Sequence, residues 1–340
     1  MQVQDSQPLL ECVPNFSEGH NVGIINRIAD AIRQIAGVKL LHVDPGADAN
    51  RTVMTFVGVP SAVVEAAFQS IKTAAQLIDM RQHQGTHPRI GATDVCPLIP
   101  IAGLDMQDVA ELAQNLGQRV GQELDIPVYL YEYAAQNANR RNLALIRRGE
   151  YEGLASKIAL PEWQPDFGPT QGSFPAGASV IGARKFLIAY NVNLDTRNVA
   201  IARRIAERVR ESGYKIKDQQ GQVQIIPGRC PGVKAIGWDM PAYGRAQVSM
   251  NITDLDLTPV HLAFAACQEE ALKLGVNVTG SELIGLAPLR VFLEAGAYFA
   301  PGFRDSTQQI KAAIDGLGLQ ELGAFDPTKR ILEYRMQLDA

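Results

Sequence analysis

The chain has 340 residues and a formal net charge of -4, and 46% of its residues are hydrophobic against 20% that are charged. Enough apolar side chains are present for a large core, which excludes an extended disordered chain. The mild acidity argues against a nucleic-acid-binding protein, since such proteins usually carry a strongly positive surface. The length is typical of two domains.

The sequence contains neither a signal-peptide pattern nor an apolar stretch of membrane-helix length. The first eight residues are polar, contain no Lys or Arg and lead into no signal-peptide pattern. No stretch reaches the roughly 18 apolar residues that a membrane helix needs. The four cysteines, Cys12, Cys96, Cys230 and Cys267, lie far apart without CxxC spacing, which indicates reduced thiols. We therefore expect a cytoplasmic protein that binds neither a membrane nor nucleic acid.

The first half of the chain alternates between strand and helix patterns. Apolar residues recur at helix spacing, and short apolar runs bounded by turn residues mark the strands. In chain order we expect a strand at Leu9–Val13, a helix at Asn21–Ile35, strands at Val38–Val43 and Val53–Val59, a helix at Ser61–Met80, a strand at Val95–Ile101, a helix at Asp105–Leu124, a strand at Ile126–Tyr131 and a helix at Asn142–Lys157. Asp44-Pro45-Gly46 is expected to turn the chain after the second strand.

The Pro- and Gly-rich stretch Trp163–Ala178 is expected to be a loop, and we place the domain boundary at its end, giving domains 1–178 and 179–340. The second half then continues with a strand at Phe186–Asn191, a helix at Thr196–Arg210, strands at Val233–Trp238 and Gln247–Ile252, a helix at Thr258–Leu274, a strand at Val276–Thr279 and a helix at Pro288–Leu293. Both halves follow the order β-α-β-β-α-β. This order predicts an α+β protein of two ferredoxin-like subdomains.

The segment Asp79–Asp94 has the most concentrated chemistry, because it contains two histidines, two arginines and two aspartates. We expect His87 to act as a general acid-base, since imidazole takes and returns a proton near pH ~6.5. Its tautomer needs a partner, and Asp44, Asp79 and Asp94 are candidates. The alternative is that His87 caps the preceding helix and holds the loop by hydrogen bonds.

A zinc site is a further alternative for this segment. His83 and His87 are four residues apart, the spacing that puts two ligands on one face of a helix. However, Gly85 lies between them and Pro88 follows, and proline disfavours helical geometry at the residue before it. No CxxC or HExxH pattern completes a tetrahedral site. We therefore expect His87 to lie off the helix and no metal to be bound.

Two basic clusters are candidates for binding carboxylates. Asn139-Arg140-Arg141 and Arg147-Arg148 bring four guanidinium groups close in sequence, and Gly182-Ala183-Arg184-Lys185 adds two positive charges. Arginine binds carboxylates in a bidentate manner, although such clusters are more often solvated faces.

Several motifs, in the right order, make the chain resemble the glutamate formimidoyltransferase family. They are Glu11–Gly19, Asn50–Val53, Thr55–Gly58, Leu77–Met80, His87–Pro97, Asp166–Pro169, Gly182–Ala189 and Ile331–Tyr334. The resemblance implies two ferredoxin-like subdomains with a ligand tunnel between them, and a homodimer. The vertebrate members are fused to a cyclodeaminase; this chain stops just after Tyr334, and we expect that second activity to be absent.

The resemblance also implies an activity: transfer of the formimino group from N-formimino-L-glutamate to N5 of the co-substrate tetrahydrofolate. The catalytic histidine of the family falls on His87 and its aspartate partner on Asp44, and an arginine that matters to the family falls on Arg140. With Arg184 and Lys185, Arg140 is a candidate for binding substrate carboxylates. The folate-contacting loop corresponds to Gly168, Pro169, Thr170, Gln171, Gly172, Ser173, Phe174, Pro175, Ala176 and Gly177.

Other functions stay open. The same site could use 5-formyltetrahydrofolate, either to transfer its formyl group to glutamate or to close it to the methenyl form. From a different class, the chain could be a folate-binding module without activity. A zinc hydrolase is the third alternative.

Overall fold

A computed structural model describes residues 8–47, 49–218 and 221–337. The chain is of the α+β type and divides into two compact units, with the boundary between Arg184 and Lys185. Among the described residues, no helix is both long enough and apolar enough to cross a membrane.

The first unit is built on a seven-stranded mixed sheet. In chain order its elements are β1 (Leu9–Cys12), β2 (Asn15–Phe16), α1 (Val22–Arg33), β3 (Val38–Gly46), β4 (Arg51–Gly58), α2 (Pro60–Leu77), β5 (Thr93–Ala102), α3 (Met106–Glu123), β6 (Val128–Glu132), α4 (Leu143–Ile146), α5 (Leu154–Ile158) and β7 (Ser179–Ala183). The strand order is β1-β4-β2-β5-β7-β6, with β3 paired to β4 and β1 also paired to β5. β7 runs parallel to both β5 and β6, and the other pairs are antiparallel.

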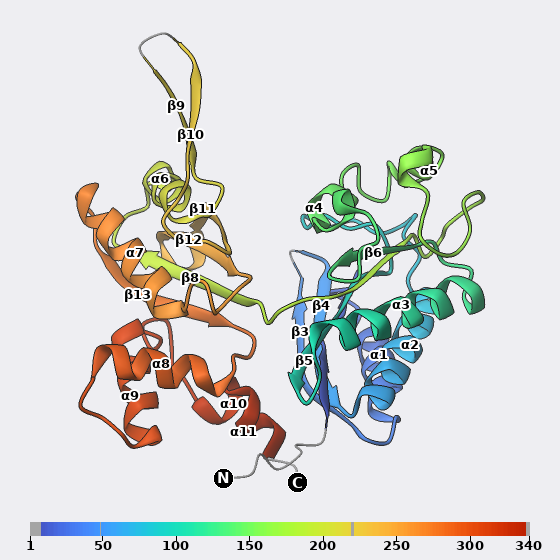
Figure 1. The fold of residues 1–340 in the computed structure, drawn as a ribbon, viewed down its shortest axis with the longest axis horizontal. Coiled ribbons are helices and arrows are strands. Elements are labelled where there is room, and N and C mark those ends of the chain that lie inside the picture. The colour runs from blue at the N-terminus through green and yellow to red at the C-terminus, as the bar shows by residue number, and fades with distance from the viewer. Residues whose placement is uncertain (1–7, 48, 219–220, 338–340) are drawn as a thin grey trace. The chain divides into compact units, whose positions relative to one another are not determined.

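The sheet of the first unit is buried on both faces near β5, β7 and β6. Helices α1, α2 and α3 lie together along one side (Figure 1) and form the larger core with alternate strand residues such as Cys96 and Leu98. The strand residues that alternate with these, including Val95 of β5 and Tyr129 of β6, point to the opposite face. There they pack with Ile146 of α4 and other apolar side chains. This alternation is the two-residue period of a strand, and it fixes which side chains of β5 face each layer.

Local sequence signals explain where the helices start. The side chain of Asn21 accepts a hydrogen bond from the backbone N–H of Ile24 and caps α1. Asp105 and Asp108 form a reciprocal capping box on α3. Pro60 occupies the first turn of α2, where its missing N–H costs nothing. The three long helices of this half were therefore predicted close to their observed bounds.

Two predictions for the first half are wrong. The expected helix Asn142–Lys157 is split into α4 and α5, because Gly149 (φ +89°) and Glu150 (φ +53°) adopt left-handed conformations that end a helix. The expected turn at Asp44-Pro45-Gly46 is part of β3. A proline fits there because β3 pairs with β4 alone among the described strands, so Pro45 is on an edge strand.

The second unit is a four-stranded antiparallel sheet with helices on one face. Its elements are β8 (Ile188–Leu194), α6 (Val199–Val209), β9 (Tyr214–Lys217), β10 (Val223–Ile226), β11 (Val233–Met240), β12 (Arg245–Ile252), α7 (Val260–Lys273), β13 (Val278–Ile284), α8 (Leu289–Phe299), α9 (Ser306–Leu317), α10 (Pro327–Arg330) and α11 (Leu332–Gln337). The sheet order is β11-β12-β8-β13. Strands β9 and β10 form a separate hairpin that extends away from this sheet (Figure 1).

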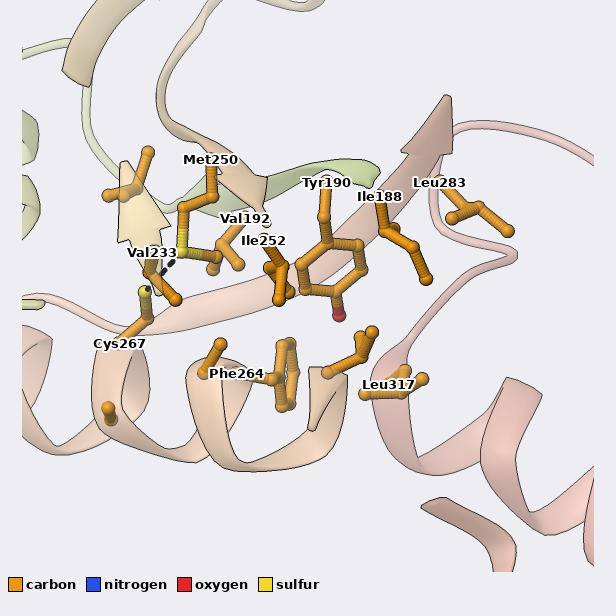
Figure 2. Packing of buried hydrophobic residues seen from close by; sticks show 14 of the residues in the cluster. Ile188, Tyr190, Val192, Val233, Met250, Ile252, Phe264, Cys267, Leu283 and Leu317 are labelled. Carbon is orange, nitrogen blue, oxygen red and sulfur yellow. Dashed lines mark hydrogen bonds between the residues drawn. The ribbon is translucent and has the colours of Figure 1, made fainter. Parts of the chain in front are cut away.

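The core of the second unit lies between its sheet and α7. Figure 2 shows Ile188, Tyr190 and Val192 of β8 pointing toward Phe264 and Cys267 of α7. The fully buried Tyr190 donates its hydroxyl hydrogen to Ser281 Oγ at 2.7 Å, so its polar atom is satisfied inside the apolar layer. Packing of this kind contributes about 1.5–3 kcal/mol for each large side chain removed from water.

Several elements of the structure were not predicted from the sequence. β7 continues the first sheet beyond the expected domain boundary at residue 178, and the hairpin β9–β10 and helix α9 had no expected counterpart. Other bounds moved: β8 starts at Ile188 rather than Phe186, β13 extends to Ile284, and α8 extends to Phe299.

Candidate active site

His87 lies in the irregular connection between α2 and β5, off the helix, as Pro88 predicts. Its Nε2 is 2.7 Å from Arg51 Nη1, and its Nδ1 is 2.7 Å from the carbonyl oxygen of Pro88. A guanidinium only donates and a carbonyl only accepts. The proton of the neutral ring is therefore on Nδ1, and the lone pair of Nε2 accepts from Arg51.

The surroundings of His87 favour its neutral form. The pKa of His87 falls from 6.5 to about 4, first because the half-buried ring is desolvated and then because Arg51 and Arg147 place positive charge near it. The hydrogen bond to Pro88 opposes this shift but is weaker than the other causes. At neutral pH the ring is thus a base with its proton on Nδ1.

Arg147, one of the two positive charges near His87, belongs to a buried ion pair. Arg147 pairs with Asp94, whose carboxylate is fully buried and also accepts the backbone N–H of Ile90 at 3.0 Å. Burial and the charge of Arg147 lower the pKa of Arg51, whereas Asp94 and Asp44 raise it. Two guanidinium groups therefore face one buried carboxylate.

Asp44 lies on β3, opposite Val53 of β4, with its side chain exposed. In the part of the chain that the structure describes, no hydrogen bond joins it to His87, whose two ring nitrogens are held by Arg51 and Pro88. Its charge acts on Arg51, which in turn contacts the ring. Orientation of His87 by Asp44 stays a prediction.

The loop that carries His87 is tied to the β3–β4 connection through Asn50. The Asn50 side chain accepts from the N–H of Gly19 at 2.9 Å and donates to the carbonyl of Gln84 at 2.6 Å. His83 Nε2 bonds the carbonyl of Asn50 at 2.9 Å. The left-handed backbone of Asn50 (φ +46°), which asparagine tolerates better than most residues, sets this geometry.

The expected folate loop, residues 168–177, lies directly beside the His87 segment. The carbonyls of Pro175 and Ala176 accept the N–H groups of Met80 and Ala92, each at 2.8 Å. At its other end the loop tip is open: nothing lies within 4 Å of where a Cβ on Gly172 would be. The predicted loop is thus joined to both ends of the segment that carries His87.

Gly91 tests how tightly these two segments must pack. A Cβ on Gly91 would lie 2.1 Å from the carbonyl oxygen of Ala178. We expect Gly91→Ala to lower the free energy of unfolding by about 2–3 kcal/mol, because the backbone has to move apart, and to raise the KM for tetrahydrofolate. The matched control is Gly302→Ala, since Gly302 has open space around its Cβ position. Urea unfolding measures the free energy of unfolding of both variants. Equal stability would contradict the prediction and mean that the backbone around Gly91 accommodates the methyl group without cost.

A polar cavity of about 490 Å³ opens on the same segment and is lined by Gln84, Gly85, Arg89, Gly149, Glu150 and Glu152. Arg89 pairs with Glu150 and Glu152 at 2.7 and 2.6 Å, and its Nε is 3.3 Å from His83 Nδ1. His83 Nδ1 therefore accepts and its Nε2 carries the proton. His83 thus helps to hold the loop through its hydrogen bonds with Asn50 and Arg89.

The guanidinium of Arg140 lies in a buried ion pair with Asp166 and binds backbone carbonyls nearby. Its Nη1 is 2.6 Å from Asp166 Oδ1, both side chains are under 10% exposed, and Nη2 donates to the carbonyls of Gln164 and Glu162. Asp166 also accepts the N–H of Leu130. The Arg140 guanidinium thereby anchors the start of the 168–177 loop, and a role in binding substrate carboxylates stays a prediction.

The remaining basic candidates lie in different places. Arg184 ends the first unit and donates its backbone N–H to Leu98 of β5. Lys185 begins the second unit and pairs with Asp254 at 2.7 Å and Asp256 at 3.5 Å. Both remain predicted carboxylate ligands.

The contact between Arg51 and His87 was not foreseen. The two residues are 36 positions apart, and hydrogen bonds of the neighbouring Asn50 with Gln84 and His83 hold the start of β4 at the loop. The polar run Asn50-Arg51-Thr52 was visible in the sequence, but nothing in its spacing connects it to His87.

Comparison with known proteins gives consistent matches along the chain. Residues 9–184 match the formiminotransferase domain, N-terminal subdomain, and residues 189–337 match the formiminotransferase domain. The formimidoyltransferase-cyclodeaminase of Rattus norvegicus is 47% identical over 96% of this chain, which spans 59% of that protein's length.

Shorter relatives match over nearly their whole length. The glutamate formimidoyltransferase of Thermoplasma acidophilum is 44% identical, over 86% of this chain and 92% of that protein. The glutamate formimidoyltransferase of Streptococcus pyogenes serotype M1 is 40% identical, over 86% of this chain and 93% of that protein. The resemblance seen in the sequence motifs is confirmed: the chain belongs to the formiminotransferase domain family.

Proposed function

We propose that the chain transfers the formimino group of N-formimino-L-glutamate to N5 of tetrahydrofolate, giving 5-formiminotetrahydrofolate and L-glutamate. Family membership and the two glutamate formimidoyltransferase relatives support the substrates. The observation that carries the mechanism is the neutral His87 ring, with its proton on Nδ1 and its Nε2 lone pair directed at Arg51.

The chemistry needs one group that first accepts and then donates a proton. N5 of the folate attacks the formimino carbon and forms the new C–N bond, and His87 takes the proton that N5 loses. When the tetrahedral centre collapses, the bond to the glutamate nitrogen breaks and His87 returns the proton to that nitrogen. The imidazole is regenerated, and acid-base catalysis of this kind contributes about 10²–10⁴-fold to the rate.

The neighbouring loop supports a role in folate binding. Residues 168–177 are joined to the His87 segment at Pro175 and Ala176, which supports a folate held by this loop near that segment. Holding both reactants beside His87 contributes a further rate factor through orientation. The reaction as written uses no metal.

The decisive experiment is a spectroscopic assay for 5-formiminotetrahydrofolate formed from N-formimino-L-glutamate and tetrahydrofolate by the purified chain. A parallel reaction contains 5-formyltetrahydrofolate and glutamate instead. Turnover with the formimino donor, and faster than with the formyl donor, is expected. Tetrahydrofolate binding without turnover of either donor would contradict the proposal and favour a folate-binding module.

We also propose that both units are ferredoxin-like subdomains. In the first unit β1 is flanked by β4 and β5, with β3 at the edge next to β4. In the second unit β8 is flanked by β12 and β13, with β11 at the edge next to β12. This shared order agrees with a repeated β-α-β-β-α-β arrangement. A homodimer, expected from the resemblance, is testable by sedimentation.

A further inference from the structure

The lone pair that the proposed reaction needs is occupied by an arginine. His87 Nε2 accepts a 2.7 Å hydrogen bond from Arg51 Nη1, while Nδ1 is fixed on the carbonyl of Pro88. Nε2 is therefore the only ring nitrogen able to take a proton from a substrate. It cannot do so while the guanidinium is in place.

Arg51 has an unusual charge environment for a largely buried arginine. In the described part of the chain no carboxylate lies within ion-pair distance of it, whereas Arg147 is paired with Asp94 and Arg89 with Glu150 and Glu152. Buried charges are normally paired, because desolvation of an unpaired charge is costly. A neutral imidazole is a weak substitute for a carboxylate.

The charged groups around the ring and Arg51 come from four parts of the first unit. Arg51 of β4 and Arg147 after α4 act on the ring, and Asp94 of β5 and the exposed Asp44 of β3 act on Arg51. One buried carboxylate serves two guanidinium groups, so positive charge is in excess beside Nε2. The position is suited to an anion that can reach Arg51.

We infer that Arg51 binds a carboxylate of the glutamyl substrate and, on doing so, leaves Nε2 of His87, which frees the base only when substrate is present. This inference rests on the proposed function, since the glutamyl donor supplies the carboxylate. The exchange replaces a neutral acceptor by a charged one, and hydrogen bonds between ions are roughly twice as strong as neutral ones. Arg51 is thus a substrate ligand that also controls the base.

The exchange has a measurable electrostatic signature. In the free protein the pKa of His87 is about 4, and Arg51 is one of its causes. A bound carboxylate offsets the charge of Arg51, and moving the guanidinium away removes its contact with Nε2. Glutamate or glutarate should therefore raise the pKa of His87 toward 6.5.

The experiment is an NMR pH titration of the histidine rings in the full chain, which has five histidines, with His87→Gln used for assignment. The probes are L-glutamate and glutarate, with glutaramide as the uncharged control. We expect the two carboxylates, and not the amide, to shift the His87 titration upward. No shift at saturating glutamate would overturn the inference. The titration itself is made on the wild-type chain, and His87→Gln serves only to assign the signal.

Arg51→Met and its matched control Arg27→Met form the second arm, since Arg27 is an exposed arginine on α1 of the same unit. Arg51→Met should raise the His87 pKa without ligand, abolish the response to glutamate and raise the KM for the formimino donor about 10- to 100-fold. Arg51→Lys should restore part of the response. Arg27→Met should behave as wild type. An unchanged His87 titration in folded Arg51→Met would also overturn the inference.

The proposed function and the proposed role of Arg51 can each fail without the other. If glutamate shifts His87 but no formimino transfer occurs, the proposed function is wrong while the carboxylate exchange at Arg51 stands. If transfer occurs and glutamate leaves His87 unchanged, the function stands and Arg51 does not control the base.

Discussion

His87→Ala is expected to lower kcat by about 10²–10⁴-fold, because in the proposed mechanism His87 takes the proton from N5 and returns it to glutamate. The KM values should change little, since the 168–177 loop is fastened by backbone bonds that the substitution leaves in place. Steady-state kinetics with both substrates, supplemented by added imidazole to restore part of the rate, provides the measurement.

His20→Ala is the control for this variant, since His20 is exposed and lies in a turn before α1. Its kinetics should match wild type. An unchanged kcat in His87→Ala would remove His87 from the mechanism and leave the helix-end hydrogen-bonding role as the explanation for its position.

Arg140→Ala should have the largest effect on stability. Loss of the guanidinium leaves the carboxylate of Asp166 buried without its partner, and breaking a buried pair from one side costs about 3–5 kcal/mol. For a unit of this size the melting temperature should fall by roughly 10 °C. Differential scanning calorimetry of wild type and variant measures both quantities.

A second substitution separates the structural role of Arg140 from a role in binding. Adding Asp166→Asn to Arg140→Ala removes the unpaired charge but keeps an acceptor for the N–H of Leu130, so stability should partly return. If the single variant is as stable as wild type and the donor KM rises tenfold or more, Arg140 binds substrate and its pairing with Asp166 contributes little.

The fold was predictable where a local signal decides the outcome. Apolar periodicity located α1, α2 and α3, because each of these helices buries one apolar face. The helix expected at Asn142–Lys157 failed because a favourable periodicity across residues 149 and 150 gave no sign of the left-handed backbone there. β7 was missed because its place between β5 and β6 depends on distant pairing partners.

The candidate site, too, could be predicted only in part from the sequence. His87 and the 168–177 loop stand out in the sequence by residue type and by resemblance, and backbone hydrogen bonds from Met80 and Ala92 join the segment that carries His87 to this loop. The partner of the ring could not be read from spacing. Asp44 was the expected neighbour, yet Arg51 lies against Nε2, and Asn50 ties the start of β4 to the loop. Contacts between segments so far apart in the chain depend on the tertiary structure, which a single sequence leaves undetermined.

The fastening of the 168–177 loop at Pro175 and Ala176 has an evolutionary consequence. A side chain at Gly172, at the tip, would have open space around its Cβ, whereas the end of the loop shares backbone bonds with the segment that carries His87. If the loop binds folate as proposed, a changed tip can alter which pterin tails are accepted while His87 stays in place.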